Sequence, residues 1–180
     1  MRLRGKKYSG QRNHIHKFER LYGEPEIRFI RPDDRPLIDR MLDRYAAEHS
    51  DADTMELFEL QQTRRLLDAY ENLHLHAACI IADGQIAAFS IGEIIGDMLV
   101  IHVEKALRQY EGIYPTMFNG FVRLLADTID EVPQWINRED DSGDPGLRMS
   151  KMQYHPIRMV DKYVVHVYTF PMSCSRAASQ

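Results

Sequence analysis

The sequence predicts a mixed α+β domain in which a mostly antiparallel sheet is flanked by helices. Three apolar, β-rich segments follow one another across tight turns, at residues 75–82, 85–95 and 98–103. The dipeptide Asp83-Gly84 between the first two is typical of a two-residue hairpin. Segments with helical periodicity stand before and after this meander, which favours a central sheet covered by helices.

An arm and two helices are expected before the meander. Apolar residues recur at helical spacing within residues 11–22, so part of the arm should dock on the domain. An extended piece, residues 26–30, comes next. An aspartate before Pro36 can cap the following helix, and Asp53 with Glu56 three residues later forms a capping box for another.

Helices and strands alternate after the meander. We expect a helix over 114–129, a short strand over 133–137, a helix over 146–154 and a final strand over 159–170. The crossover helix between the third strand and the next one favours parallel pairing there. Two strands that part at this point leave backbone amides beside the loop at 104–113.

The chain is long enough for one domain with a real core, with a basic arm over 1–24, a body over 25–170 and a flexible tail over 171–180. Apolar residues make up 44% and charged residues 28%, as in ordinary soluble proteins. No apolar run approaches the ~18 residues of a membrane span, and no secretory signal is visible. Cys79 and Cys174 have no metal-like spacing, which favours a reducing cytoplasm.

Positive charge gathers at the N-terminus. Residues 1–20 hold seven Lys or Arg and one Glu, a formal charge of +6, whereas the whole chain carries −4. A basic arm on an acidic body predicts contact with phosphates of tRNA or of anionic lipid at the inner membrane face. The alternative is a solvated leader that pairs with the body. The candidate side chains are Lys6, Lys7, Arg12, His14, His16 and Lys17.

A strand, a polar loop and a helix follow one another over residues 98–129. Free N–H groups in such a loop and at a helix N-terminus can hold an anion, which points to a transferase whose donor carries phosphate. An ordinary strand–helix connection is the alternative. The histidines show no metal-ligand spacing with cysteines or carboxylates, so we expect no metal ion.

Several motifs in fixed order resemble the family related to the C-terminal domain of phosphatidylglycerol lysyltransferase, which has the GNAT acyltransferase fold. The resemblance covers nearly the whole chain. Its motifs are Gly5-Lys-Lys-Tyr, Gln11-Arg-Asn-His-Ile-His-Lys-Phe, His102-Val-Glu-Lys-Ala, Gly112-Ile-Tyr, Ile136-Asn-Arg-Glu-Asp, Gly143-Asp-Pro-Gly-Leu-Arg, Lys151-Met-Gln-Tyr-His-Pro and Asp161-Lys-Tyr.

This resemblance implies transfer of an aminoacyl group from aminoacyl-tRNA, or of an acyl group from coenzyme A, to an amine or hydroxyl acceptor. Family members look like two tandem GNAT-like halves, and this chain resembles the second. That implies a homodimer or a partner that supplies the first half. The donor-binding positions it implies are Val103, Arg108, Gln109, Gly112 and Ile113.

The donor loop departs from the usual GNAT pattern, which is richer in glycine. Only Gly112 remains of the glycines, and Glu111 would face any bound phosphate. This departure, with the missing first half, keeps open an alternative function as a non-catalytic GNAT-like domain that binds a ligand or a partner.

Acyl transfer needs a base for the nucleophile and an acid for the leaving group. Glu93 has apolar neighbours, and such a carboxylate suits a base unless it faces solvent. Glu104 is a second candidate base, with an exposed ion pair to Lys105 as the alternative. The resemblance implies Tyr154 as leaving-group acid, unless it only packs on the sheet. His102 is expected to be a hydrogen-bonded core residue.

Polar residues after the strand at 133–137 and on the last helix are candidate substrate ligands, because sites gather at the carboxyl ends of strands. Asn137 can order a substrate amine, whereas Arg138 can bind substrate or pair with Asp140 or Asp141. The acidic run from Glu139 is expected to be a solvated turn. The candidate substrate-binding residues are Asn137, Arg138, Arg148 and Lys151.

Overall fold

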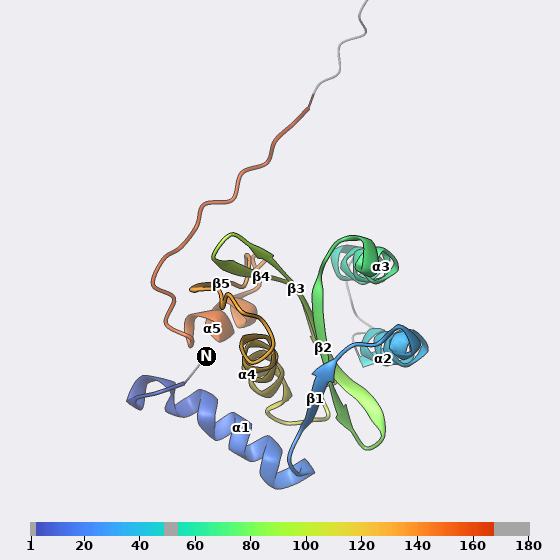
Figure 1. Ribbon diagram of the computed structural model, residues 1–180, viewed down its shortest axis with the longest axis vertical. Coiled ribbons are helices and arrows are strands. Elements are labelled where there is room, and N and C mark those ends of the chain that lie inside the picture. Colours follow the sequence, from blue (N-terminus) through green and yellow to red (C-terminus); the bar gives the residue numbers. More distant parts are fainter. Residues whose placement is uncertain (1–2, 49–53, 168–180) are drawn as a thin grey trace, which may run out of the picture.

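The computed structural model describes residues 3–48 and 54–167 and has a five-stranded sheet between two helical layers (Figure 1). The strands lie in chain order, antiparallel from β1 to β4, with β5 parallel to β4. The predicted α+β architecture is confirmed. The strands are β1 (Glu26–Phe29), β2 (His76–Ala82), β3 (Gln85–Ile95), β4 (Met98–Ala106) and β5 (Trp135–Asn137).

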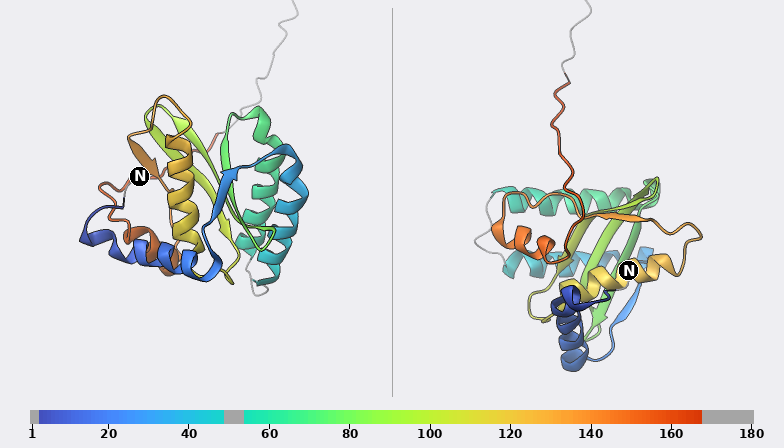
Figure 2. Two further views of the ribbon diagram at one scale, coloured as in Figure 1. Left: turned by 60° about the horizontal axis from the view of Figure 1, so that its bottom comes forward. Right: turned by 90° about the vertical axis from the view of Figure 1, so that its left-hand side faces the viewer.

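Helices α2 and α3 cover one face of the sheet, and α4 covers the other, with α1 and α5 beside it (Figures 1 and 2). None of the helices in the described ranges is long and apolar enough to cross a membrane. The helices are α1 (Ser9–Tyr22), α2 (Arg35–Glu48), α3 (Thr54–Ala69), α4 (Ile113–Ala126) and α5 (Pro145–Met152), with 3₁₀ turns η1 (Lys6–Tyr8), η2 (Pro32–Asp34) and η3 (Tyr70–Asn72).

The meander forms where its turn residues permit it. Asp83 and Gly84 both have positive φ, as the tight hairpin between β2 and β3 requires. The β3–β4 pairing contains a bulge, because Ile91 lies opposite Val103 whereas Gly92 lies opposite Ile101. One residue of β4, at position 102, is therefore extra.

Strands β4 and β5 separate soon after they meet. β5 pairs only with the first three residues of β4, Met98–Val100, and ends at Asn137. Ile101 to Ala106 have no β5 residue opposite them in that register. The split expected between two parting strands is therefore present on this side of β4.

The predicted arm is a helix packed against α4. Its Phe18 is buried and joins the main hydrophobic core. Gly112 has a φ of +82°, and a Cβ added there would collide with the carbonyl oxygen of His14 in α1. Glycine adopts this φ without strain and leaves room for the His14 carbonyl, so α1 packs closely over the start of α4.

The strand predicted over 159–170 is wrong for residues 159–167, which are extended but pair with no strand in the described part of the chain. Their apolar side chains, such as Val164 and Val165, are exposed. A β-rich segment becomes a strand only where a neighbouring edge supplies hydrogen bonds. Residues 168–180 and the predicted cap at Asp53 lie outside the described residues.

Candidate active site

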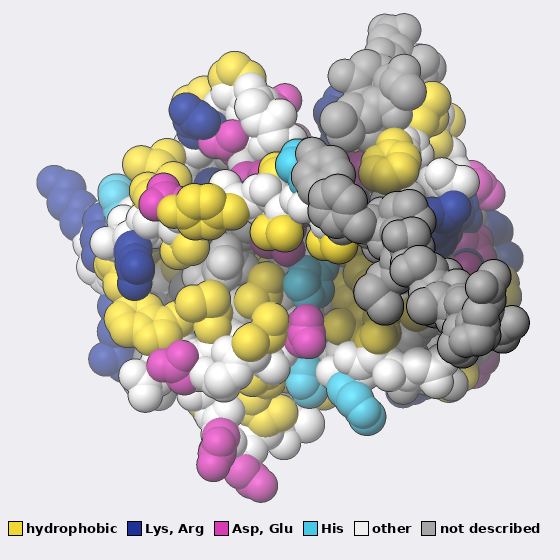
Figure 3. Space-filling model, turned by 90° about the horizontal axis from the view of Figure 1, so that it is seen from above, with side chains coloured by type: hydrophobic (Ala, Val, Ile, Leu, Met, Phe, Trp, Pro, Cys, Tyr) yellow, Lys and Arg dark blue, Asp and Glu magenta, His cyan; other side chains and the backbone are white. Residues whose placement is uncertain are grey.

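An open hollow of about 540 Å³ lies between α3 and the sheet, and we name it the α3 pocket. Space-filling atoms show histidine and acidic side chains beside apolar ones in the middle of the upper face (Figure 3). The pocket has a polar part and an apolar wall. The polar part includes Glu93, His102 and Glu139, and the apolar wall includes Leu66, Ala69, Leu73, Leu75 and Val103.

The bulge in β4 places His102 in this pocket. Lys105 contacts Glu59 of α3 through a 2.8 Å ion pair, so Lys105 and Val103 face α3. Strict alternation would turn His102 to the opposite face. The extra residue breaks that alternation, so His102 and Val103 both line the α3 pocket.

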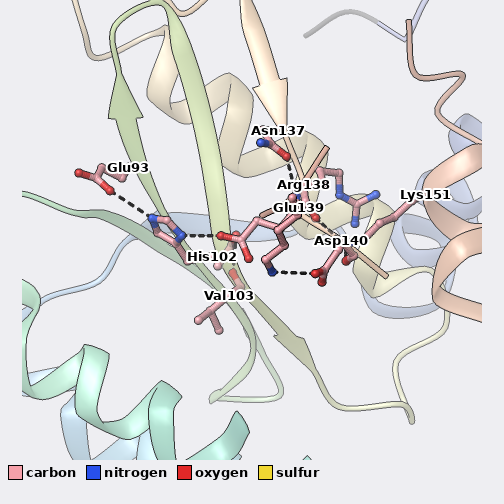
Figure 4. Close-up of polar contacts among 10 residues, drawn as sticks. Glu93, His102, Val103, Asn137, Arg138, Glu139, Asp140 and Lys151 are labelled. Atoms are coloured by element: carbon pink, nitrogen blue, oxygen red, sulfur yellow. Dashed lines mark hydrogen bonds and ion pairs between the residues drawn. The ribbon is translucent and has the colours of Figure 1, made fainter. Parts of the chain in front are cut away.

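His102 stands between two carboxylates (Figure 4). Its Nδ1 lies 2.8 Å from Oε1 of Glu139, and its Nε2 lies 3.3 Å from Oε2 of Glu93. Each ring nitrogen of His102 therefore lies within reach of a carboxylate oxygen, and the two contacts hold the ring from both sides.

Glu139 reaches His102 from a strained backbone position. Its φ is +53°, which is unusual for a residue with a side chain. The backbone N–H of Glu139 donates a 2.7 Å hydrogen bond to Oδ1 of Asn137, the last residue of β5. Asn137 thus supports the turn that aims the Glu139 carboxylate at the imidazole. Strain of this kind is common at functional sites.

The opposite face of β4 carries a second polar group. Glu104 Oε2 accepts a 3.0 Å hydrogen bond from Nη2 of Arg138, and both side chains are mostly buried. The Arg138 guanidinium lies against the rings of Phe118 and Tyr154, 4.5 and 4.9 Å from their centroids. Arg138 therefore fills space beside the split between β4 and β5.

Two pairings expected from the sequence are wrong. Glu104 pairs with Arg138 and not with Lys105, because successive residues of β4 face opposite sides of the sheet. Arg138 pairs with Glu104 on the α4 side of the sheet and not with Asp140 or Asp141 of its own loop. Two nitrogens of Arg138, Nε and Nη1, and Oε1 of Glu104 are buried without a hydrogen-bond partner in the described structure.

Tyr154 follows α5 and packs edge-on against Phe118 of α4, with 4.8 Å between ring centroids. Burial raises the pKa of the Tyr154 hydroxyl well above its usual range, so the group stays protonated at neutral pH. Tyr154 is thus both a packed aromatic residue and a hydroxyl that retains its proton.

The loop before α4 is held by the protein's own groups. The Arg108 N–H donates to Glu48 at 3.1 Å, the Glu111 N–H to the Tyr22 hydroxyl at 3.2 Å, and the Ile113 N–H to a loop carbonyl. A second hollow of about 290 Å³ lies beside Gly112. Its α1 wall includes Gln11, whose Oε1 is buried without a hydrogen-bond partner in the described structure.

The remaining candidate residues make local contacts. Gln109 accepts a 3.0 Å hydrogen bond from Arg44, and Arg148 pairs with Asp141 on the surface. The Lys151 ammonium donates to the carbonyl oxygens of Arg138 and Asp140. Burial, followed by the nearby Arg138 charge, lowers the pKa of Lys151.

The structure brings together only part of the set proposed from the sequence. Glu93 and Val103 meet in the α3 pocket, whereas Glu104, Arg138 and Tyr154 gather on the other face of β4. The loop from Arg108 to Ile113 lies beside α1. No three histidine, cysteine, aspartate or glutamate side chains in the described ranges are arranged to hold a metal ion.

The sequence predicts a hydrogen-bonded core residue at position 102 and a solvated turn at position 139. His102 is hydrogen-bonded as predicted but is 27% exposed, and Glu139 faces His102. The bulge that turns His102 depends on pairing with β3. Two weak signals for this bulge are present in the sequence, a glycine at position 92 and a histidine within an apolar strand. In the structure, a Cβ added at Gly92 would lie 2.8 Å from the carbonyl oxygen of Val100.

Comparisons with known proteins agree with this architecture. The family model for the C-terminal domain of phosphatidylglycerol lysyltransferase matches residues 1–166. A conserved protein of unknown function from Bacteroides thetaiotaomicron is 30% identical with a TM-score of 0.75, and the match covers 87% of this chain and 52% of that one. No curated protein sequence matches the chain.

Two further solved structures share the fold at lower identity. The C-terminal domain of a putative lysylphosphatidylglycerol synthetase from Agrobacterium fabrum is 14% identical, with a TM-score of 0.57 over 86% of this chain and 53% of that one. A ribosomal-protein-alanine N-acetyltransferase from Brucella melitensis is 15% identical, with a TM-score of 0.54 over 80% and 100%.

The chain spans about half the length of the Bacteroides and Agrobacterium chains that it matches. Its sheet, its crossover helix and its split between β4 and β5 agree with the GNAT fold. The family match over residues 1–166 agrees with the motifs in the sequence. The chain therefore belongs to the phosphatidylglycerol lysyltransferase C-terminal family and has a GNAT-like fold.

Proposed function

We propose that this protein is an acyl- or aminoacyl-transferase. It would move an acyl group from a phosphate-bearing donor, an acyl-CoA or an aminoacyl-tRNA, to an amine or hydroxyl acceptor. The observation that carries the proposal is the position of His102 at the bulge of β4, between Glu93 and Glu139 on one side of an open pocket. Family membership and the acetyltransferase-like fold support the reaction class.

The proposed reaction gives each group one task. The acceptor nitrogen or oxygen forms a bond to the acyl carbon, and the bond from that carbon to the donor sulfur or oxygen breaks. His102 is proposed to take the acceptor's proton, while Glu139 holds the ring and stabilises the positive charge that it gains. Tyr154, whose hydroxyl is protonated, is proposed to give a proton to the leaving group.

The donor is proposed to approach from the split side of β4. After Val100, the edge of β4 has no paired β5 residue. An acyl group that binds beside the strand requires such an unpaired edge, because its carbonyl oxygen must reach a backbone N–H group. Val103, Arg108, Gln109, Gly112 and Ile113 remain the proposed donor-side residues. Since α1 packs against the Gly112 loop, a donor phosphate there would have to displace α1 or bind at its edge.

A transfer assay tests the proposal. The protein is mixed with radiolabelled acetyl-CoA or with tRNA charged with labelled amino acids, in the presence of a mixture of amines and hydroxyl compounds. We expect label to pass from one donor to an acceptor, with a loss of about 100-fold or more in His102→Gln. His166→Gln, which replaces an exposed histidine outside the α3 pocket and the donor loop, should keep full activity. Absence of transfer from every donor would contradict the proposal.

A non-catalytic GNAT-like domain that binds a ligand or partner is the second candidate. Two observations favour it: Arg138 occupies space beside the split, and α1 covers the Gly112 loop. Saturable binding of a donor without transfer, unchanged in His102→Gln, would support this function over catalysis.

A further inference from the structure

We propose that residues 157–167 form a strand that pairs with the outer edge of β5 in a second copy of this chain. Two copies that exchange this strand form a dimer with twofold symmetry. The inference concerns assembly, so it does not depend on the proposed reaction.

The segment 157–167 has the sequence of a strand but no sheet to join. Four valines and one tyrosine lie within residues 159–167, and these residue types favour strands. Tyr163, Val165 and Val167 would share one face, whereas Lys162 and His166 would lie on the other. Such alternation is typical of a strand that buries one face. In the structure, seven large apolar side chains of this segment are 63–82% exposed.

The outer edge of β5 is open to another strand. β5 is the last strand of the sheet, and its far edge pairs with no strand in the described ranges. Residues Trp135–Asn137 carry no charge, and Trp135 is 44% exposed. Soluble proteins usually protect a free edge with charged side chains, a proline or a covering element. The edge of β5 is therefore suited to strand addition.

The opposite edge of the sheet is protected. β1 carries the charged residues Glu26 and Arg28. The Nη1 group of Arg28 donates a 3.0 Å hydrogen bond to the carbonyl oxygen of Phe29, the last residue of β1. Both features discourage strand addition at β1. We therefore assign the exchanged strand to the β5 edge.

A row of apolar side chains leads to the β5 edge. Ile95 pairs with Met98, and Met98 pairs with Trp135, so the three side chains lie side by side across β3, β4 and β5. Ile95 and Trp135 are 56% and 44% exposed. A strand added beside β5 would place its own side chain next to Trp135. An apolar residue such as Val165 would extend the row and remove apolar surface from water.

The segment starts beside its own β5 but then leads away from the domain. Lys162 Nζ lies 2.6 Å from Oδ2 of Asp140, in the loop that follows β5. After Lys162 the chain leaves the body of the molecule (Figures 1 and 2). Residues 163–167 span about 17 Å at about 3.3 Å per residue, which is enough to reach a neighbouring molecule. This direction favours the edge of a second copy over the chain's own edge.

A symmetric exchange pairs both segments and both edges. A twofold interface is self-complementary, so each copy gives one strand and receives one. Stable interfaces bury at least about 1,000 Å² in total. Two segments with seven exposed apolar side chains each, together with two Trp135 rows, offer a surface of that order. The exchange therefore has the size that a stable dimer needs.

Analytical ultracentrifugation of the full chain over a range of concentrations tests the inference. We expect a dimer whose dissociation constant rises about 10-fold or more in Val165→Pro, because proline removes an N–H group from the ladder. Trp135→Glu should have a similar effect, because it places a charge at the receiving edge. Leu57→Glu, at an apolar residue of α3 that is 58% exposed, is the matched control and should leave the dimer unchanged.

Mixing the two variants distinguishes exchange between copies from pairing within one chain. Val165→Pro keeps an intact edge, and Trp135→Glu keeps an intact segment. We expect a dimer in the mixture at a concentration where each variant alone is monomeric. Circular dichroism should show both variants folded, because Val165 and Trp135 are 80% and 44% exposed.

Three results would overturn the inference. The original chain could remain monomeric at every concentration, its dimer could be unaffected by Val165→Pro, or the mixed variants could fail to associate. Hydrogen exchange identifies the alternative in the first case. Protected amides at residues 159–167 of a monomer would show that the segment pairs with β5 of its own chain.

Discussion

Single residues decide how α1 and α4 meet. Gly112 precedes α4 with a φ of +82°, and the space where its Cβ would lie is taken by the main chain of α1. The position therefore combines backbone strain with a close approach between helices. Other glycines with positive φ, such as Gly143, have nothing within 4 Å of that space.

Replacing Gly112 by alanine should destabilise the fold more than the same change at Gly143. Both changes carry the cost of a left-handed backbone, about 1–2 kcal/mol. Gly112→Ala adds a backbone clash with α1, so we expect a total loss of about 3 kcal/mol or more in the free energy of unfolding. Urea unfolding of the two variants gives the comparison. Equal losses would show that α1 does not pack closely over Gly112.

Glu104 and Arg138 form an ion pair, and the effect of breaking it on the free energy of unfolding depends on its burial. Glu104→Ala leaves the Arg138 guanidinium among aromatic rings without its carboxylate, and we expect a loss of about 3–5 kcal/mol in unfolding free energy. The matched control is Glu111→Ala, which removes the exposed partner of Lys17 and should cost under about 1 kcal/mol. Similar losses in both variants would mean that Arg138 is solvated in solution.

A second mostly buried ion pair joins β1 to η2, the turn before α2. The Asp34 carboxylate in η2 accepts two hydrogen bonds from Arg28 of β1, at 2.6 and 2.8 Å, and a third from the Arg31 N–H at 2.7 Å. The Arg28 hydrogen bond is the main reason that the pKa of Asp34 lies below its usual value, with the Arg31 backbone bond adding to it. These bonds fix the turn that directs α2 onto the sheet.

Asp34→Asn should lower the unfolding free energy at pH 7 by about 3 kcal/mol, because it leaves Arg28 without a counter-charge. In the original protein, the contribution of Asp34 is full above the ordinary pKa of 3.8 and is lost as pH falls toward the lower folded-state pKa. The difference between variant and original should therefore shrink below that pH. Asp33→Asn, at an exposed neighbour, is the control. A difference that stays constant down to pH 3 would contradict this account.

At the scale of the whole molecule, charge is divided between a basic N-terminal region and an acidic body. Part of the basic charge is used internally: Arg12 donates to the carbonyl oxygens of Leu3 and Gly5, and Lys17 pairs with Glu111. Lys6 and Lys7 are exposed. Because Phe18 of α1 belongs to the core, deleting the arm would disturb the fold as well as its charge.

Charge reversal is therefore the sharper test of phosphate binding by the arm. If the arm contacts tRNA or anionic lipid, Lys6→Glu with Lys7→Glu should weaken binding and reduce the slope of log affinity against log salt by about 2. Filter binding to tRNA and flotation with phosphatidylglycerol vesicles measure the two partners separately. Asn13→Gln, an uncharged exchange at an exposed site of α1, is the control. Unchanged affinity for both partners would leave the arm with a structural role only.

The order of the elements and the architecture follow from local features of the sequence. Turn residues such as Asp83-Gly84, the period of the apolar residues and the capping pattern are local properties, so each segment from β1 to α5 could be placed within a few residues. The motifs around His102, Gly112 and Tyr154 also indicate the family.

Which polar residues lie together depends on contacts between distant parts of the chain. A bulge shared between two strands turned His102 into the α3 pocket, and a positive φ after β5 brought Glu139 to it from 37 residues away. The same long-range packing placed Arg138 against Glu104 and left residues 159–167 without a strand partner in the described chain. The register between strands that are distant in the sequence cannot be predicted from local sequence, because it depends on which strand edges pair in the folded protein.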